Sequence, residues 1–124
     1  MNVVAWILSG LLAIAFIGAG AGKLFTTREK LLANPRMAWA NDFTDSQVKG
    51  IAAAEVLGGI GVILPWLLDI ARILTPLAAV GLAVIMVGAL VTHARRGELK
   101  EALPVNSILF ALAVAVAIIR FSQL

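Results

Sequence analysis

The chain has no cysteine and a single histidine, and only 14% of its residues are charged. The lack of cysteine excludes disulfide exchange, thiolate nucleophiles and cysteine-ligated metals, and it leaves the redox compartment undetermined. One histidine is too few for the several imidazoles that transition-metal sites usually need, so we expect no metal site. The shortage of charge argues against a soluble domain, because 124 residues would need a larger polar surface.

Apolar residues, by contrast, are abundant: 61% of the chain is hydrophobic and its mean hydropathy is +1.00. Four runs approach the ~20 residues that a membrane-spanning helix needs. We therefore predict an all-α membrane protein with a single domain, residues 1–124. The first run follows no basic stretch and is long for a signal peptide, so we expect it to remain as a span. The four transmembrane helices of this bundle are expected over about residues 3–23, 47–68, 73–93 and 104–120.

The longest polar stretch, residues 26–48, is too apolar in places for a freely solvated loop. We expect one or two short amphipathic helices there, lying on the membrane surface or folded over the bundle. Pro35 predicts a turn within this stretch. Thr44 and Gln47 have the spacing of a capping box, which would open the second span.

The other two connections are short. Residues 69–72 leave room only for a hairpin between antiparallel spans, after a helix expected to run through Pro65. Residues 99–102 are expected to complete the third loop, with Pro104 at the start of the last helix, where a missing N–H costs little.

Basic residues are distributed unequally between the two sides of the predicted bundle. Eight lie in or beside the first and third connections, and two lie on the opposite side. The positive-inside rule therefore places these two connections in the cytoplasm and both termini outside, in a multi-pass protein of the cell membrane. The pI near 10 reflects this topology, so we expect no nucleic-acid partner. The eight are Lys23, Arg28, Lys30, Arg36, Lys49, Arg95, Arg96 and Lys100, and the two are Arg72 and Arg120. Trp6 and Trp66 lie on the side of these two and fit an aromatic belt at that membrane interface.

Glu55 is the most informative residue, because a central charge in a span costs roughly 2.5–3.5 kcal/mol and usually marks a functional site. It follows Lys49 by six residues, which places it roughly 9 Å into the second span at 1.5 Å per residue. Lys23 ends the first span on that side, His93 ends the third, and Asn106 begins the fourth. We predict that these four residues form one polar ligand-binding site at the cytoplasmic end of the bundle.

Three of these residues also have a structural interpretation. Glu55 could be an internal ion pair with Lys23 or His93 that only fixes helix packing. Lys23 alone fits an interface anchor whose charge reaches the head groups, and His93 alone fits an interfacial histidine. Gly58 and Gly59 share the helix face of Glu55, where they would allow either close packing of a neighbour or a cavity beside the acid.

Several segments together resemble the DoxX-like membrane proteins over essentially the whole chain. They are AGAGKL, GIAAAEVLGGIGVILP, LTPLAAVGLAVIMVGALVTHARRGE and the closing IIRF, and NPRMAWANDF resembles the actinobacterial-type branch. The resemblance implies a small four-helix bundle, related to the small subunit of thiosulfate:quinone oxidoreductase and to an animal chaperone of receptor assembly. It also implies that Lys23, Glu55 and His93 occupy recurring polar positions.

Three functions fit these observations. The first is binding of a small lipophilic ligand, quinone- or isoprenoid-like, or service as the membrane subunit of an oxidoreductase. If a reaction is catalysed, Glu55 and His93 are the candidate acid–base pair. No flavin, haem or nicotinamide motif is recognisable, so electron transfer would need a partner or the substrate itself.

The second function is assembly of another membrane protein without chemistry, through small-residue faces at Gly18, Gly22 and Gly58. The third, a proton-coupled exporter, is disfavoured because small exporters of that kind carry their acid in the first span. Besides the lipid bilayer, the expected partners are a second copy of the chain or another membrane protein.

Overall fold

The computed structural model describes residues 2–34, 39–41 and 43–124, and in these residues it is helical without strands. Four helical segments are long and apolar enough to cross a membrane. This confirms the predicted all-α, four-span fold with a short helix in the first connection. The elements are α1 (Asn2–Leu24), α2 (Arg28–Ala33), α3 (Asp45–Gly61), α4 (Leu64–Leu68), α5 (Leu74–Arg95) and α6 (Leu99–Ser122).

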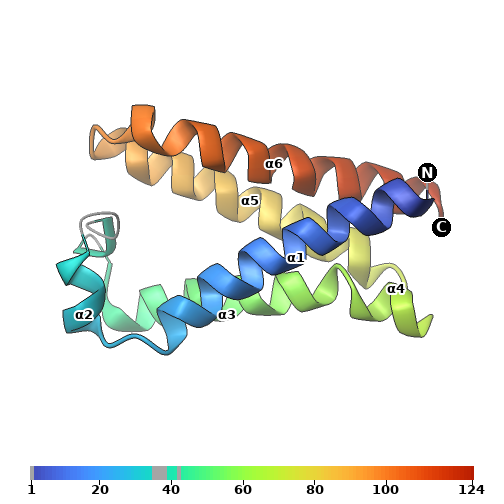
Figure 1. Cartoon of the computed structure of the whole chain (residues 1–124), viewed down its shortest axis with the longest axis horizontal. Helices are drawn as coiled ribbons and strands as arrows, with labels where there is room; N and C mark the ends of the chain where they lie inside the picture. The colour runs from blue at the N-terminus through green and yellow to red at the C-terminus, as the bar shows by residue number, and fades with distance from the viewer. Residues whose placement is uncertain (1, 35–38, 42) are drawn as a thin grey trace.

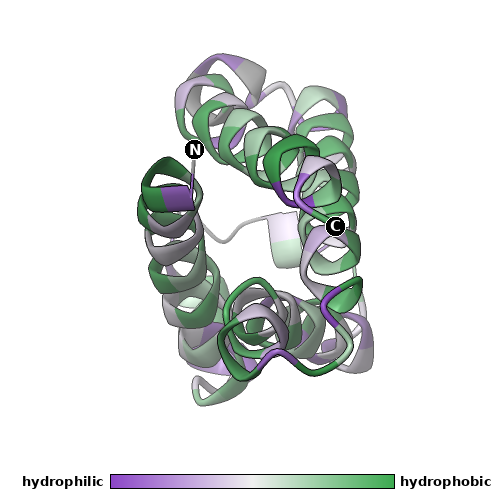
Figure 2. Cartoon of the chain, turned by 90° about the vertical axis from the view of Figure 1, so that its right-hand side faces the viewer, coloured by the Kyte–Doolittle hydropathy of each residue, from purple (hydrophilic) through white to green (hydrophobic). Residues whose placement is uncertain are grey.

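The spans form a closed ring of antiparallel neighbours (Figures 1 and 2). The most extensive contacts join α1 to α3 and α5 to α6, and smaller contacts join α1 to α6 and α3 to α5. Both termini and α4 lie at one end of the bundle, which we call the terminal end (Figure 1). The helix α2 and the connection between α5 and α6 lie at the other, which we call the α2 end.

The apolar residues divide between a small interior and a large outer surface. Leu12, Phe16, Leu82 and Val116 belong to the buried core between the spans. In each span, no more than 33% of the most apolar window is buried inside the molecule. The remaining apolar surface fits contact with lipid chains, so the chain is a multi-pass membrane protein.

Close helix packing depends on glycines that the sequence only partly identified. A Cβ on Gly20 of α1 would lie 2.6 Å from the carbonyl oxygen of Ala52 in α3, and one on Gly58 would lie 2.5 Å from Leu82 Cδ2 in α5. The face of Glu55 is therefore used for packing at Gly58. A Cβ on Gly18 or Gly22 would have nothing within 4 Å, so these two glycines serve no contact among the described residues.

The second span is interrupted where the sequence predicted a continuous helix. Pro65 has no N–H to donate to the carbonyl of Gly61, and the helix breaks there into α3 and α4. The freed carbonyl accepts a hydrogen bond from Thr75 Oγ1 of α5 at 3.0 Å. The turn that follows α4 has left-handed backbone at Asp69 (φ 54°) and Ala71 (φ 49°).

The last helix begins earlier than the sequence indicated. Residues 99–102, expected in a loop, form the first turn of α6, and Pro104 lies inside the helix. Leucine, lysine, glutamate and alanine are all strong helix formers, which accounts for the correction. The third connection is thereby reduced to three residues, 96–98, with Gly97 in the left-handed region at φ 72°.

The first connection folds against the bundle rather than extending from it. Leu31 of α2, Ala40 and Val48 of α3 form a small buried cluster. The capping box is confirmed: Gln47 N–H donates to Thr44 Oγ1 at 3.1 Å, and Thr44 N–H donates to Gln47 Oε1 at 2.9 Å. The turn predicted at Pro35 lies outside the described residues.

Candidate functional site

Glu55 is held by an ion pair with Lys23, inside the bundle near its α2 end. Lys23 Nζ, in the last turn of α1, lies 2.6 Å from Glu55 Oε1. The Glu55 residue is 2% exposed, whereas the Lys23 side chain keeps 16% of its surface. Lys23 Nζ also lies 5.4 Å from the ring centroid of Trp39. A buried carboxylate needs such a partner, because it has lost its water.

The backbone at the end of α1 is fixed by a second lysine. Lys49 Nζ donates to the carbonyl oxygens of Leu24 at 3.2 Å and Thr26 at 2.6 Å, and also to that of Lys23. Carbonyls at the end of a helix have no partner within it, and a cation there also interacts favourably with the helix dipole. Lys49 therefore positions Lys23. From the sequence alone, Lys49 counts only as one of the basic residues that indicate the orientation in the membrane.

His93 is engaged with the third connection. Its Nδ1 lies 3.2 Å from Glu98 Oε2, while Arg96 Nε donates to Glu98 Oε1 at 2.8 Å. These hydrogen bonds, that from Arg96 first, lower the pKa of Glu98 below its ordinary value of 4.5. No hydrogen bond or ion pair among the described residues joins His93 to Glu55, so the two line one site without forming a bonded pair.

Asn106 carries a donor without a partner. Its Nδ2 is buried and makes no hydrogen bond among the described residues. A buried amide NH₂ without a partner is unfavourable, so this donor is a polar group of the cavity with unused hydrogen-bonding capacity among the described residues.

The four predicted residues line one cavity of about 580 Å³ at the α2 end. Each span contributes to its wall, and the first connection adds Trp39 and Phe43. The sequence did not assign these two aromatics to the site, although their apolar character in a polar stretch was the available signal. The lining residues are Ala19, Lys23, Trp39, Phe43, Ile51, Glu55, Ile85, Met86, Gly88, Ala89, Thr92, His93, Arg95, Val105, Asn106 and Leu109.

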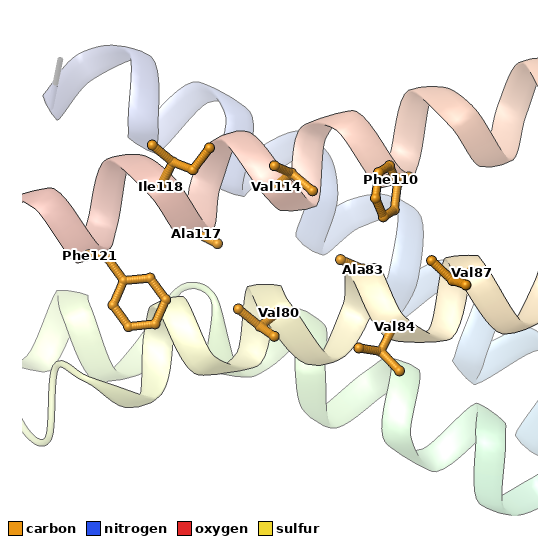
Figure 3. A pocket seen from close by; sticks show the side chains of 9 residues that line it. All are labelled: Val80, Ala83, Val84, Val87, Phe110, Val114, Ala117, Ile118 and Phe121. Carbon is orange, nitrogen blue, oxygen red and sulfur yellow. The ribbon is translucent and has the colours of Figure 1, made fainter.

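A second hollow lies between α5 and α6 and has a different character (Figure 3). It measures about 360 Å³ and is lined by nine apolar residues, among them Val84, Phe110 and Phe121. No polar side chain belongs to that lining, so it offers nothing to orient or transform a ligand. The cavity around Glu55 is therefore the candidate site.

The polar side chains that line this cavity are the Lys23–Glu55 ion pair, the His93 imidazole, the Asn106 amide, the Thr92 hydroxyl and the Arg95 guanidinium. In the described part of the chain, no group of three or more histidine, cysteine, aspartate or glutamate side chains is placed to hold a metal. The apolar walls with a few convergent polar groups are typical of sites for small, largely apolar molecules.

Fold and site define the class of this protein: a small four-span integral membrane protein with a polar cavity between its helices. Within that class, the model of the DoxX-like family matches residues 7–116, and the chain belongs to that family. No curated protein and no solved structure matches the chain.

Proposed function

We propose that this protein binds a small lipophilic ligand, quinone- or isoprenoid-like, in the cavity around Glu55. The observation that carries the proposal is the unpaired amide of Asn106 in the same cavity as the Lys23–Glu55 pair. A volume of about 580 Å³ lies within the range of roughly 300–1,000 Å³ that ligand sites occupy.

The polar groups suit a ligand with one or two oxygen acceptors. Lys23 has three ammonium hydrogens and gives Glu55 only some of them, and Asn106 Nδ2 has two that are unused among the described residues. A quinone carbonyl or an isoprenoid hydroxyl could accept from either group. The rest of the ligand would contact Ile85, Met86 and Leu109, which form apolar walls.

If the bound ligand also reacts, the protein would serve as the membrane subunit of an oxidoreductase. Electrons would come from a partner protein or from the ligand itself. Glu55 and His93 would then be the groups that hold or release a proton, since both line the cavity.

Assembly of another membrane protein is the second candidate, and one observation favours it. Gly18 and Gly22 lie one turn apart on α1 and are exposed, and a Cβ added to either would meet nothing within 4 Å. Such a small-residue face lets another helix approach closely. This function would depend on α1 and not on Glu55.

Mass spectrometry of ligand retained by the purified protein tests the proposal. The wild type, Glu55→Gln and Asn106→Leu are extracted in a mild detergent, and their small-molecule content is compared after a short-chain ubiquinone analogue is added. We expect both variants to retain at least about tenfold less ligand, which corresponds to about 1.4 kcal/mol of binding free energy. Ser107→Ala, at an exposed neighbouring position, is the matched control.

The outcomes separate the candidates. Equal ligand content in all four proteins, each folded, would overturn the ligand-binding proposal. Failure of Glu55→Gln to fold, with normal content in Asn106→Leu, would assign the ion pair to packing alone. Loss of a co-purifying membrane protein in Gly18→Leu, with Glu55→Gln unaffected, would favour assembly.

A further inference from the structure

The terminal end of the bundle contains a buried cation outside the cavity. Arg120, in the last turn of α6, is 0% exposed. Its guanidinium lies between two indoles, with Cζ 4.8 Å from the ring centroid of Trp6 and 4.4 Å from that of Trp66. The sequence indicated only a charge that ends the span, so this burial was not predicted.

The hydrogen bonds of Arg120 leave one edge of the guanidinium unused. Nη1 donates to Asn2 Oδ1 at 3.0 Å and to Gln123 Oε1 at 2.8 Å. Nε and Nη2 are buried and have no partner among the described residues. These two nitrogens form the side-on edge of the group, a planar fork that binds two oxygens of one phosphate or carboxylate.

The charge of Arg120 is also uncompensated by the part of the chain that the structure describes. No ion pair joins it to a described carboxylate, and a second cation lies close by. Arg72 Cζ lies 4.0 Å from the ring centroid of Trp66, so two guanidinium groups contact one indole. Arg72 Nε lies 3.5 Å from Asp69 Oδ1, and the Asp69 side chain is 80% exposed. A buried charge of this kind calls for an anion.

We propose that the Nε–Nη2 fork of Arg120, supported by Arg72, binds the phosphate group of an anionic phospholipid. The helices end here and two tryptophans flank the site, which fits the head-group region of a bilayer, where lipid phosphates lie. Asn2 and Gln123 both accept from Nη1, so neither of them occupies the Nε–Nη2 edge that would bind the phosphate.

Native mass spectrometry in a non-ionic detergent tests the proposal with defined lipids. Phosphatidylglycerol is compared with monogalactosyl diacylglycerol of the same acyl chains, which has no phosphate. The wild type is expected to prefer phosphatidylglycerol. Arg120→Lys keeps the charge and loses the fork, and Arg72→Gln removes the second cation at a half-exposed position. Each is expected to weaken phosphatidylglycerol binding about tenfold.

Lys100→Gln removes an exposed positive charge at the opposite end and is expected to bind as the wild type does. Inorganic phosphate is tested alone on delipidated protein. Stabilisation that is lost in Arg120→Lys would support the fork and identify free phosphate as its source of oxygens. Equal binding of the two lipids by the wild type, with no effect of phosphate, would overturn the proposal. So would unchanged lipid preference in Arg72→Gln and Arg120→Lys.

Discussion

At the scale of the residue, the Lys23–Glu55 pair has to be judged against its desolvation. Glu55 is almost fully buried, and the two charges are 2.6 Å apart. An ion pair taken out of water is often no more stable than apolar residues of the same volume, although loss of one partner is severe. Stability alone therefore gives no reason for an acid at this position, whereas a ligand contact would.

The pair can be tested by removing its members singly and together. Lys23→Met leaves the Glu55 carboxylate buried without a cation, so we expect the free energy of unfolding to fall by about 3 kcal/mol. Lys23→Met with Glu55→Leu removes both charges and is expected to restore most of that loss. Unfolding by sodium dodecyl sulfate in mixed micelles measures the free energy of unfolding of the single and the double variant. A double variant no more stable than Lys23→Met would contradict the expected cost of the unpaired carboxylate.

At the scale of the element, α1 presents two glycine positions with opposite roles. A side chain at Gly20 would meet the backbone of α3, which cannot move away, whereas one at Gly18, two residues earlier, would meet nothing. The sequence showed small residues spaced along α1 but could not show which of them faces α3. That choice depends on how the helix is rotated within the bundle.

The two positions make a matched pair for mutagenesis. Gly20→Ala would place a methyl group 2.6 Å from the Ala52 carbonyl oxygen and is expected to lower the free energy of unfolding by about 2 kcal/mol. Gly18→Ala adds helix propensity in open space and is expected to be neutral or to stabilise by up to about 1 kcal/mol. Thermal unfolding in detergent compares them, and equal effects would show that the α1–α3 packing is misjudged.

The third connection is expected to respond to pH through Glu98. Its pKa in the folded protein is lowered, so its contribution to stability is present above about pH 4.5 and is lost as the pH falls through the lower folded value. Glu98→Gln should therefore melt below the wild type at neutral pH, and the difference should vanish in acid well below pH 4.5. A difference in melting temperature between the wild type and Glu98→Gln that grows as the pH falls would contradict this prediction.

At the scale of the whole molecule, much of the fold could be predicted because lipid imposes a simple rule. Spans must be about 20 apolar residues long, and the four runs met that rule. The break at Pro65 and the early start of α6 were missed although both have local signals, a proline without an N–H inside a span and a run of strong helix formers at residues 99–102. What the sequence could not show is that Thr75 of another helix donates to the carbonyl freed at the break.

Four polar residues of the cavity could be predicted from the sequence, whereas its two aromatic residues and the pairing of its polar groups could not. Depth along each span brought Lys23, Glu55, His93 and Asn106 to one end, and they do line one cavity. That Lys23 contacts Glu55 while His93 contacts Glu98 follows from the order of helices around the ring, which the sequence does not contain. The burial of Arg120 between two tryptophans depends on the same order.

The orientation in the membrane is a further proposal for the whole molecule. We propose that the α2 end is cytoplasmic, because the segments that meet there carry eight basic residues and those at the terminal end carry two. A phosphatase reporter, active only outside the cytoplasm, is expected to be active when fused after Leu124 and inactive when inserted after Gly97. The reverse pattern would overturn this orientation.

The central claim is that the cavity holds a ligand, and filling the cavity tests it most directly. Gly88 lines the cavity and Gly81 lies two turns away on nearly the same face of α5; both are exposed, and a Cβ added to either would have nothing within 4 Å. Both leucine substitutions should therefore fold. We predict that Gly88→Leu loses the ligand detected by mass spectrometry and that Gly81→Leu retains it. Equal ligand content in the two folded variants would contradict the claim.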